Sequence, residues 1–131
     1  MSTTRPRTVA ELVSAAKQRI ENLSSDQFAA ELARGQTLIV DVREPDERNQ
    51  NGAIRGAVHA PRGMLEFYAD PASPYHRQEF DPARRTLLYC ASGGRSALAV
   101  QALQQLGYTN IAHLDGGLKA WAAGGRGLTR A

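Results

Sequence analysis

The chain contains a single cysteine, Cys90, among 131 residues, and this scarcity limits its chemistry. One cysteine cannot form an internal disulfide, so nothing in the sequence argues for an oxidising compartment. The three histidines, His59, His76 and His113, form no close ligand pair with one another or with the cysteine. Because metal sites usually show such pairs in the sequence, we expect neither a metal nor an organic cofactor.

Long apolar runs and one-sided charge are also missing. No stretch approaches the roughly 18 apolar residues that a membrane-spanning helix needs, and the polar segment 1–7 lacks the apolar core of a signal peptide. We therefore expect a cytoplasmic protein with no membrane contact. The net charge is +3, and the arginines are scattered rather than gathered in a basic run. Nucleic acid is accordingly not an expected partner.

The residues that are present predict one globular domain. Hydrophobic residues make up 42% of the chain and charged residues 22%, ordinary values for a domain of this length. Apolar runs typical of buried strands alternate with helical patterns. The expected strands are residues 37–42, 57–60, 87–89 and 110–114, and residues 20–23 either end the first helix or add a short strand. This alternation predicts an α/β fold with three layers (α/β/α), a central, mostly parallel sheet of about five strands, and an extra N-terminal helix.

Capping patterns and glycines set the expected boundaries. Thr8 and Ser24 each open a capping box before a helical pattern. The first of these helices has an apolar face that could pack on the domain or on a second copy. We expect a turn at residues 49–52 and a long surface loop at 70–85. The predicted organisation is a tail and helix over residues 1–19, the main domain over 20–124 and a flexible Gly/Arg tail over 125–131.

The stretch around Cys90 is the candidate functional site. A short apolar strand stops at this cysteine, two glycines and Arg95 follow, and a helical pattern then begins. If the loop curls around Cys90, its amides, the helix N-terminus and the Arg95 charge all favour the thiolate, which is the nucleophilic form of cysteine. We therefore interpret Cys90 as a nucleophile rather than as a small buried hydrophobe.

Four segments in sequence resemble the rhodanese family of sulfurtransferases. They are DVREPDE at residues 41–47, GAIRGA at 52–57, CASGGRS at 90–96 and LDGGLKAW at 114–121. The similarity covers roughly residues 20–124 and leaves the first helix outside. Two positions depart from the family pattern: Ala53 stands where many members have histidine, and Ala91 stands where some have a basic residue.

The resemblance implies a two-step transfer of sulfur through Cys90. The cysteine thiolate would take the outer sulfur of thiosulfate or a similar small anionic donor and would become a persulfide. Cyanide, a thiol or a protein cysteine would then accept the sulfur. The substrate-binding residues implied are Ala91, Ser92, Gly93, Gly94, Arg95 and Ser96, with Asp41 and Arg43 in a supporting role or as an ordinary ion pair.

Other functions remain open at this point. Cysteine phosphatases and arsenate reductases on a related fold have five residues between cysteine and arginine, whereas four lie between Cys90 and Arg95. A loop one residue shorter suits a single sulfur atom better than a tetrahedral phosphate. A sulfur-relay or protein-interaction module would keep the same loop and act on a protein partner. A Cys–His hydrolase is disfavoured because the histidines lie at no recognisable spacing, and mercaptopyruvate is a less expected donor because loops that use it tend to read Cys-Gly-Ser-Gly.

Overall fold

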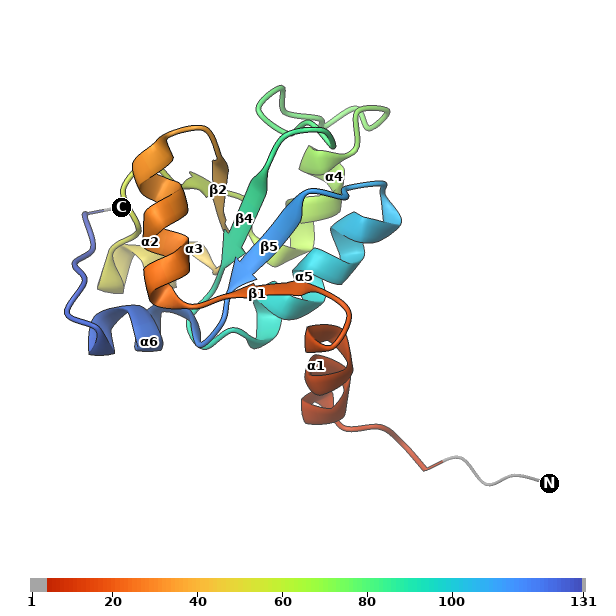
Figure 1. The fold of residues 1–131 in the computed structure, drawn as a ribbon. Coiled ribbons are helices and arrows are strands. Elements are labelled where there is room, and N and C mark those ends of the chain that lie inside the picture. The colour runs from red at the N-terminus through yellow and green to blue at the C-terminus, as the bar shows by residue number, and fades with distance from the viewer. Residues whose placement is uncertain (1–4, 131) are drawn as a thin grey trace.

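The sheet of this protein is entirely parallel. In the computed structural model, which describes residues 5–130, five strands lie in the order β1-β5-β4-β2-β3, and each neighbouring pair is parallel (Figure 1). The strands are β1 (Glu21–Leu23), β2 (Leu38–Asp41), β3 (Val58–His59), β4 (Thr86–Tyr89) and β5 (Ile111–Leu114). The predicted α/β fold is therefore confirmed, and residues 21–23 form a strand rather than the end of the first helix.

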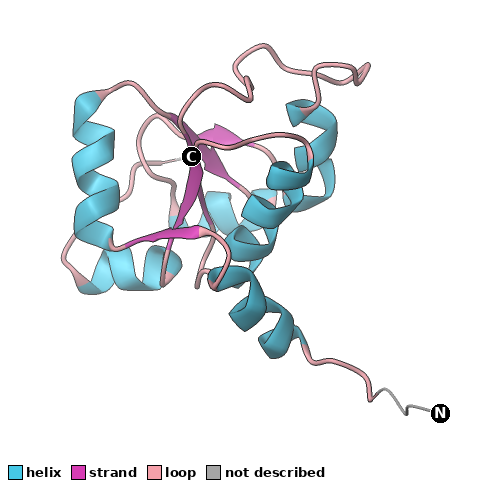
Figure 2. Ribbon diagram, turned by 45° about the vertical axis from the view of Figure 1, so that its right-hand side comes forward, coloured by secondary structure: helices cyan, strands magenta, loops and turns pink. Residues whose placement is uncertain are grey.

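Helices cover both faces of this sheet (Figure 2). They are α1 (Val9–Lys17), α2 (Ser25–Arg34), α3 (Pro45–Asn51), the 3-10 turn η1 (Arg62–Met64), α4 (Leu65–Ala69), α5 (Gly94–Gln105) and α6 (Gly117–Ala123). Figure 1 shows α2 and α6 on one side of the sheet and α4 and α5 on the other. Among residues 5–130, no helix is both long and apolar enough to cross a bilayer.

Two apolar cores fill the space between these layers. All residues of β2, β4 and β5 are buried, because both faces of a parallel sheet are covered. Side chains from α4 and α5 pack with Val40 and Leu88 in one core, and side chains from α2 and α6 pack with Leu87 and Leu114 in the other. Successive residues of one strand thus point into different cores.

The N-terminal helix packs on the domain. Its predicted capping box is present, with Thr8 and Glu11 bonded to each other's backbone, and the same holds for Ser24 and Gln27 at α2. Helix α1 lies against α5 and buries Ala16, so the first of the two expected arrangements is observed. Because α5 begins at the Cys90 loop, α1 lies beside the candidate site.

One sequence prediction about local structure was wrong. The turn expected at residues 49–52 is helical to Asn51, because Pro45 starts α3 and Gly52 closes its last turn by donating to the Arg48 carbonyl. The flexibility of the tail after residue 124 stays a prediction, and the tail lies along the domain as far as it is described. Thr129 and Ala53 exchange two backbone hydrogen bonds of 2.8 Å. The irregular loop expected at residues 70–85 is confirmed.

Candidate active site

Cys90 is the first residue after β4, and the loop that follows it leads directly into α5. Its Sγ accepts backbone N–H bonds from Gly93 at 3.1 Å and from Ser96 at 3.4 Å, and the residue is only 1% exposed. The loop turns this tightly because Gly93 has a φ of +98°, a left-handed conformation that other residues disfavour. Two amides and the positive end of the α5 dipole therefore converge on one sulfur atom.

The two serines of the loop lie in different surroundings. Ser96 is fully buried, and its hydroxyl oxygen lies 3.5 Å from Sγ of Cys90. Ser92 is exposed and lies on the outer surface of the loop. Ser96 is therefore the serine whose hydroxyl contacts the sulfur, and Ser92 is accessible to an approaching substrate.

The N-terminus of α6 holds the start of the loop. The amide of Leu118 donates to the Cys90 carbonyl and that of Lys119 donates to the Ala91 carbonyl, both at 3.0 Å. The close approach requires Gly117, whose φ is +60° and whose missing Cβ would lie 2.6 Å from backbone atoms of Ala91. Gly117 thus serves the geometry of the cysteine loop, although it lies more than twenty residues away from it in sequence.

We expect Gly117→Ala to lower both activity and stability. A Cβ at 2.6 Å from backbone must displace the loop, and a shift of about 1 Å at a reacting group can reduce a rate about 100-fold. Sulfur-transfer kinetics and urea unfolding measure the two effects. The matched control is Gly35→Ala, which has a φ of +71° but open space around it, so only the backbone strain of about 1–2 kcal/mol applies. Equal loss of activity in both variants would contradict the steric argument.

Arg95 is engaged by a carboxylate that the sequence did not suggest. Its two terminal nitrogens lie 2.7 and 2.8 Å from the two carboxylate oxygens of Glu47, the third residue of α3. The hydrogen bonds from Arg95 lower the pKa of Glu47 to about 2, and those to Glu47 raise the pKa of Arg95. To bind Arg95 as expected, an anion must either displace Glu47 or bind the guanidinium on the side that Glu47 leaves open.

Asp41 and Arg43 form a buried ion pair at the end of β2. Arg43 is 1% exposed and Asp41 is not exposed, and two side-chain hydrogen bonds of 2.8 and 3.0 Å join them. Burial raises the pKa of Asp41, but the hydrogen bonds and charge of Arg43 outweigh it, so the net effect is a lowered pKa. Arg48 also donates to this carboxylate at 3.0 Å.

This ion pair reaches the cysteine loop through Tyr89. The Tyr89 hydroxyl donates to Asp41 at 3.0 Å and accepts the amide of Ile54 at 3.1 Å. Tyr89 immediately precedes Cys90, and burial raises its pKa well above the ordinary value for tyrosine. The predicted supporting role of Asp41 and Arg43 is therefore consistent with contacts that fix the end of β4. Their charged groups bind each other, and their hydrogen bonds within residues 5–130 place neither of them on Sγ.

The histidines lie apart from one another. His59 contacts the Arg43 carbonyl at 2.7 Å, and His76 contacts the Phe80 carbonyl at 3.0 Å. His113 is fully buried, and its Nδ1 lies 2.8 Å from the Ser96 hydroxyl. Sequence spacing could not reveal this contact, although a histidine inside an apolar strand is itself a signal. Within residues 5–130, no three histidine, cysteine or acidic side chains cluster as metal ligands.

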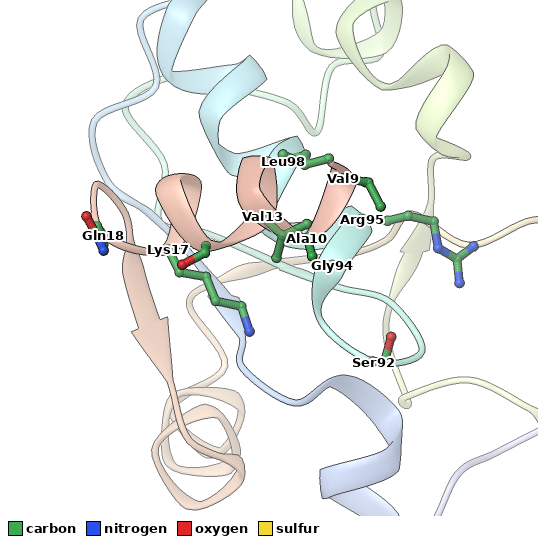
Figure 3. A pocket seen from close by; sticks show the side chains of 10 residues that line it. Val9, Ala10, Val13, Lys17, Gln18, Ser92, Gly94, Arg95 and Leu98 are labelled. Carbon is green, nitrogen blue, oxygen red and sulfur yellow. The ribbon is translucent and has the colours of Figure 1, made fainter. Parts of the chain in front are cut away.

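A groove of about 790 Å³ is lined by α1, the loop and the start of α5 (Figure 3). Its walls include Val9 and Val13 of α1 and Leu98 of α5, with Ser92 at the loop end. Lys17 also lines it and pairs with Asp115 at 2.9 Å. Figure 3 shows the Arg95 side chain extending away from α1, so the groove is predominantly apolar where the two helices face each other.

Several known proteins resemble this chain in sequence or in fold. The family described as the rhodanese-like domain matches residues 24–124. A protein named sulfurtransferase from Allochromatium vinosum is 33% identical over 107 residues, which are 81% of this chain and 92% of that protein.

Two solved structures extend the comparison. A Rhodopseudomonas palustris protein, described as of unknown function and a possible tyrosine phosphatase, superposes with a TM-score of 0.89 at 37% identity and covers 98% of this chain and 99% of its own. A thiosulfate sulfurtransferase from Pseudomonas aeruginosa gives a TM-score of 0.74 at 29% identity over 92% of this chain and 22% of that one.

Proposed function

Since the chain belongs to the rhodanese-like domain family and resembles proteins named as sulfurtransferases, we propose that it moves a sulfane sulfur from thiosulfate, or a similar small anion, to a thiophilic acceptor through a persulfide on Cys90. The observation that carries the proposal is the position of Sγ at the end of β4, where the amides of Gly93 and Ser96 donate to it. Such a cradle stabilises negative charge on sulfur.

In the first half-reaction, the Cys90 thiolate attacks the outer sulfur of the donor. For thiosulfate, a sulfur–sulfur bond forms at Sγ, the bond between the two donor sulfurs breaks, and sulfite leaves with its electron pair. The enzyme then carries a persulfide anion, so charge is conserved without a proton transfer. The loop amides act at the carboxyl end of the sheet, where ligands of open α/β folds bind.

In the second half-reaction, the acceptor attacks the terminal sulfur of the persulfide. Cyanide, a small thiolate or a protein cysteine forms a bond to that sulfur, and the Cys90 thiolate leaves. The acceptor departs with one additional sulfur atom, and the enzyme returns to its starting form. Two separate half-reactions predict ping-pong kinetics.

Phosphatase chemistry fits the loop less well. Four residues separate Cys90 from Arg95, and the Arg95 guanidinium is bound bidentately by Glu47 instead of being free to clamp a phosphate. We therefore expect no hydrolysis of aryl phosphates by the purified protein.

We expect Arg95→Gln to weaken donor binding. A guanidinium near the loop attracts the dianionic donor, and loss of a hydrogen bond to a charged group costs about 1.5–3 kcal/mol, so KM for thiosulfate should rise roughly ten- to 100-fold. Steady-state kinetics with cyanide as acceptor measures the change. The matched control is Arg62→Gln. Arg62 is a half-exposed arginine that also pairs with a glutamate, Glu66, and its loss should leave KM unchanged. An unchanged KM in Arg95→Gln would show that Arg95 only positions Glu47.

The proposal is tested by the intact mass of the protein after brief exposure to excess thiosulfate. We expect a gain of one sulfur atom that cyanide removes and that does not occur in Cys90→Ser. Because the chain has one cysteine, the site of the added sulfur is unambiguous. No gain, with Cys90 still open to alkylation, would contradict the small-molecule donor and would direct the search to a protein donor.

A further inference from the structure

A chain of hydrogen bonds runs from the nucleophile to the edge of the sheet. Sγ of Cys90 lies 3.5 Å from the Ser96 hydroxyl, which lies 2.8 Å from Nδ1 of His113, and Nε2 of His113 lies 2.7 Å from Oδ1 of Asn22. Cys90, Ser96 and His113 are each at most 1% exposed. Water therefore does not compete for the bonds among these three residues, whose directions are set by the groups themselves, whereas Asn22 is half-buried.

The tautomer of His113 follows from the neighbouring amide. The Asn22 amide nitrogen donates to the carbonyls of Lys17 and Ile20, so Oδ1 is the atom that faces His113, and it can only accept. His113 must therefore carry a hydrogen on Nε2. Burial lowers the pKa of His113 to about 4, which leaves Nδ1 unprotonated near neutral pH. Nδ1 is thus an acceptor, and the Ser96 hydroxyl donates its hydrogen to it.

This arrangement leaves Ser96 with no hydrogen for the sulfur. A hydroxyl has one hydrogen to donate, so towards Cys90 the Ser96 oxygen can only accept, and the partner that suits it is a thiol S–H. A bare thiolate would have the amides of Gly93 and Ser96 as donors but not the hydroxyl. To gain that third donor, Ser96 would have to leave Nδ1 of His113 buried and unpaired, which costs free energy.

We propose that His113 is a positioning residue that withholds the Ser96 hydroxyl hydrogen from Cys90 and so favours the forms of the cysteine whose inner sulfur is uncharged, the thiol and the persulfide. Its catalytic consequence rests on the proposed function. Thiosulfate and the bare thiolate exchange with persulfide and sulfite, so once the thiolate has formed, destabilising it favours the persulfide side of this exchange. Release of the Cys90 thiolate from the persulfide becomes correspondingly less favourable, so His113 makes Cys90 a poorer leaving group.

Two positively charged side chains near this chain of hydrogen bonds, Lys17 and Arg95, are already paired with carboxylates. Lys17 of α1 and Asp115, which follows β5, have opposite effects on the pKa of His113, and they bind each other at 2.9 Å. Arg95, in the first turn of α5, binds Glu47 at 2.7 Å. Lys17 and Arg95 therefore each have a carboxylate partner, and the Ser96 hydroxyl is the group whose orientation His113 controls.

The test is a pH titration of Cys90, monitored by the ultraviolet absorbance of the thiolate, with Cys90→Ser as the blank. It gives the pH at which half of Cys90 is ionised. The single cysteine makes the signal specific. His113→Phe keeps a ring but has no acceptor, so Ser96 can then donate to the sulfur. We expect this variant to move the midpoint down by about one pH unit. At a pH below the midpoint, this shift is a roughly tenfold larger thiolate fraction. In a Ser96→Ala background the same substitution should produce no shift.

Two outcomes of this titration would overturn the proposal. An upward shift in His113→Phe would mean that His113 takes the thiol proton through Ser96, and a shift that persists in the Ser96→Ala background would mean that the effect bypasses the hydroxyl. If His113→Phe does not fold, ¹⁵N NMR of the unaltered protein decides: an unprotonated Nδ1 at neutral pH is expected, and an imidazolium would refute the argument. Neither measurement uses a sulfur donor, so their failure is distinct from failure of the mass test.

Discussion

Cys90→Ser is expected to transfer no measurable sulfur with any combination of donor and acceptor. A serine hydroxyl is not ionised near neutral pH and forms no persulfide, so both half-reactions lose their covalent intermediate. Steady-state release of thiocyanate from thiosulfate and cyanide measures the loss. Because Cys90 is the chain's one cysteine, no other thiol can substitute for it.

The same variant should keep its fold, which separates loss of chemistry from loss of structure. The serine oxygen can still accept the Gly93 amide that now donates to Sγ at 3.1 Å. We expect the free energy of unfolding to change by no more than about 1 kcal/mol, as measured by urea denaturation. Sulfur transfer by a folded Cys90→Ser protein would exclude the persulfide mechanism outright.

The layered fold could be predicted because the strand signals are local. β2 and β4 are continuous apolar runs, and a run without alternation is typical of a strand covered on both faces. The caps at Thr8 and Ser24 are also local, since each side chain bonds an amide three residues away. The tail after residue 124 could not be predicted in this way. Thr129 is held by Ala53, a partner 76 residues distant in sequence.

The candidate site divides along the same line. The turn at Gly93 and the start of α5 are properties of a short segment, so the cradle around Sγ could be anticipated from the loop sequence. The partners of Arg95 and Ser96 could not, because Glu47 lies on α3 and His113 lies on β5. Both contacts arise only when the strands pair in the order β5-β4-β2. The Glu47 contact also reduces the positive charge that Arg95 presents to a substrate. The loop sequence alone, which contains the arginine but not its partner, overstates that charge.

Asp41→Asn is expected to destabilise the fold by about 3–5 kcal/mol. The substitution keeps the shape of the side chain but removes the charge that compensates Arg43, which is 1% exposed and receives no comparable screening from water. It also weakens the hydrogen bonds from Arg48 and Tyr89 to the same carboxylate. Urea unfolding near neutral pH measures the effect. The matched control is Glu66→Gln, whose partner Arg62 is 34% exposed, and it should cost less than about 1 kcal/mol.

The pH dependence of this difference follows from the lowered pKa of Asp41. A carboxyl whose pKa is lower in the folded state than in the unfolded state contributes stability above the unfolded value, about 3.9, and loses it as the pH falls through the folded value. The gap in unfolding free energy between the unaltered protein and Asp41→Asn should therefore be widest above about pH 4 and should narrow in stronger acid. A gap that stays constant into strong acid would mean that the variant loses packing around Arg43 rather than the charge of Asp41. The end of β4, and with it the position of Cys90, would then depend on the shape of this pair rather than on its electrostatics.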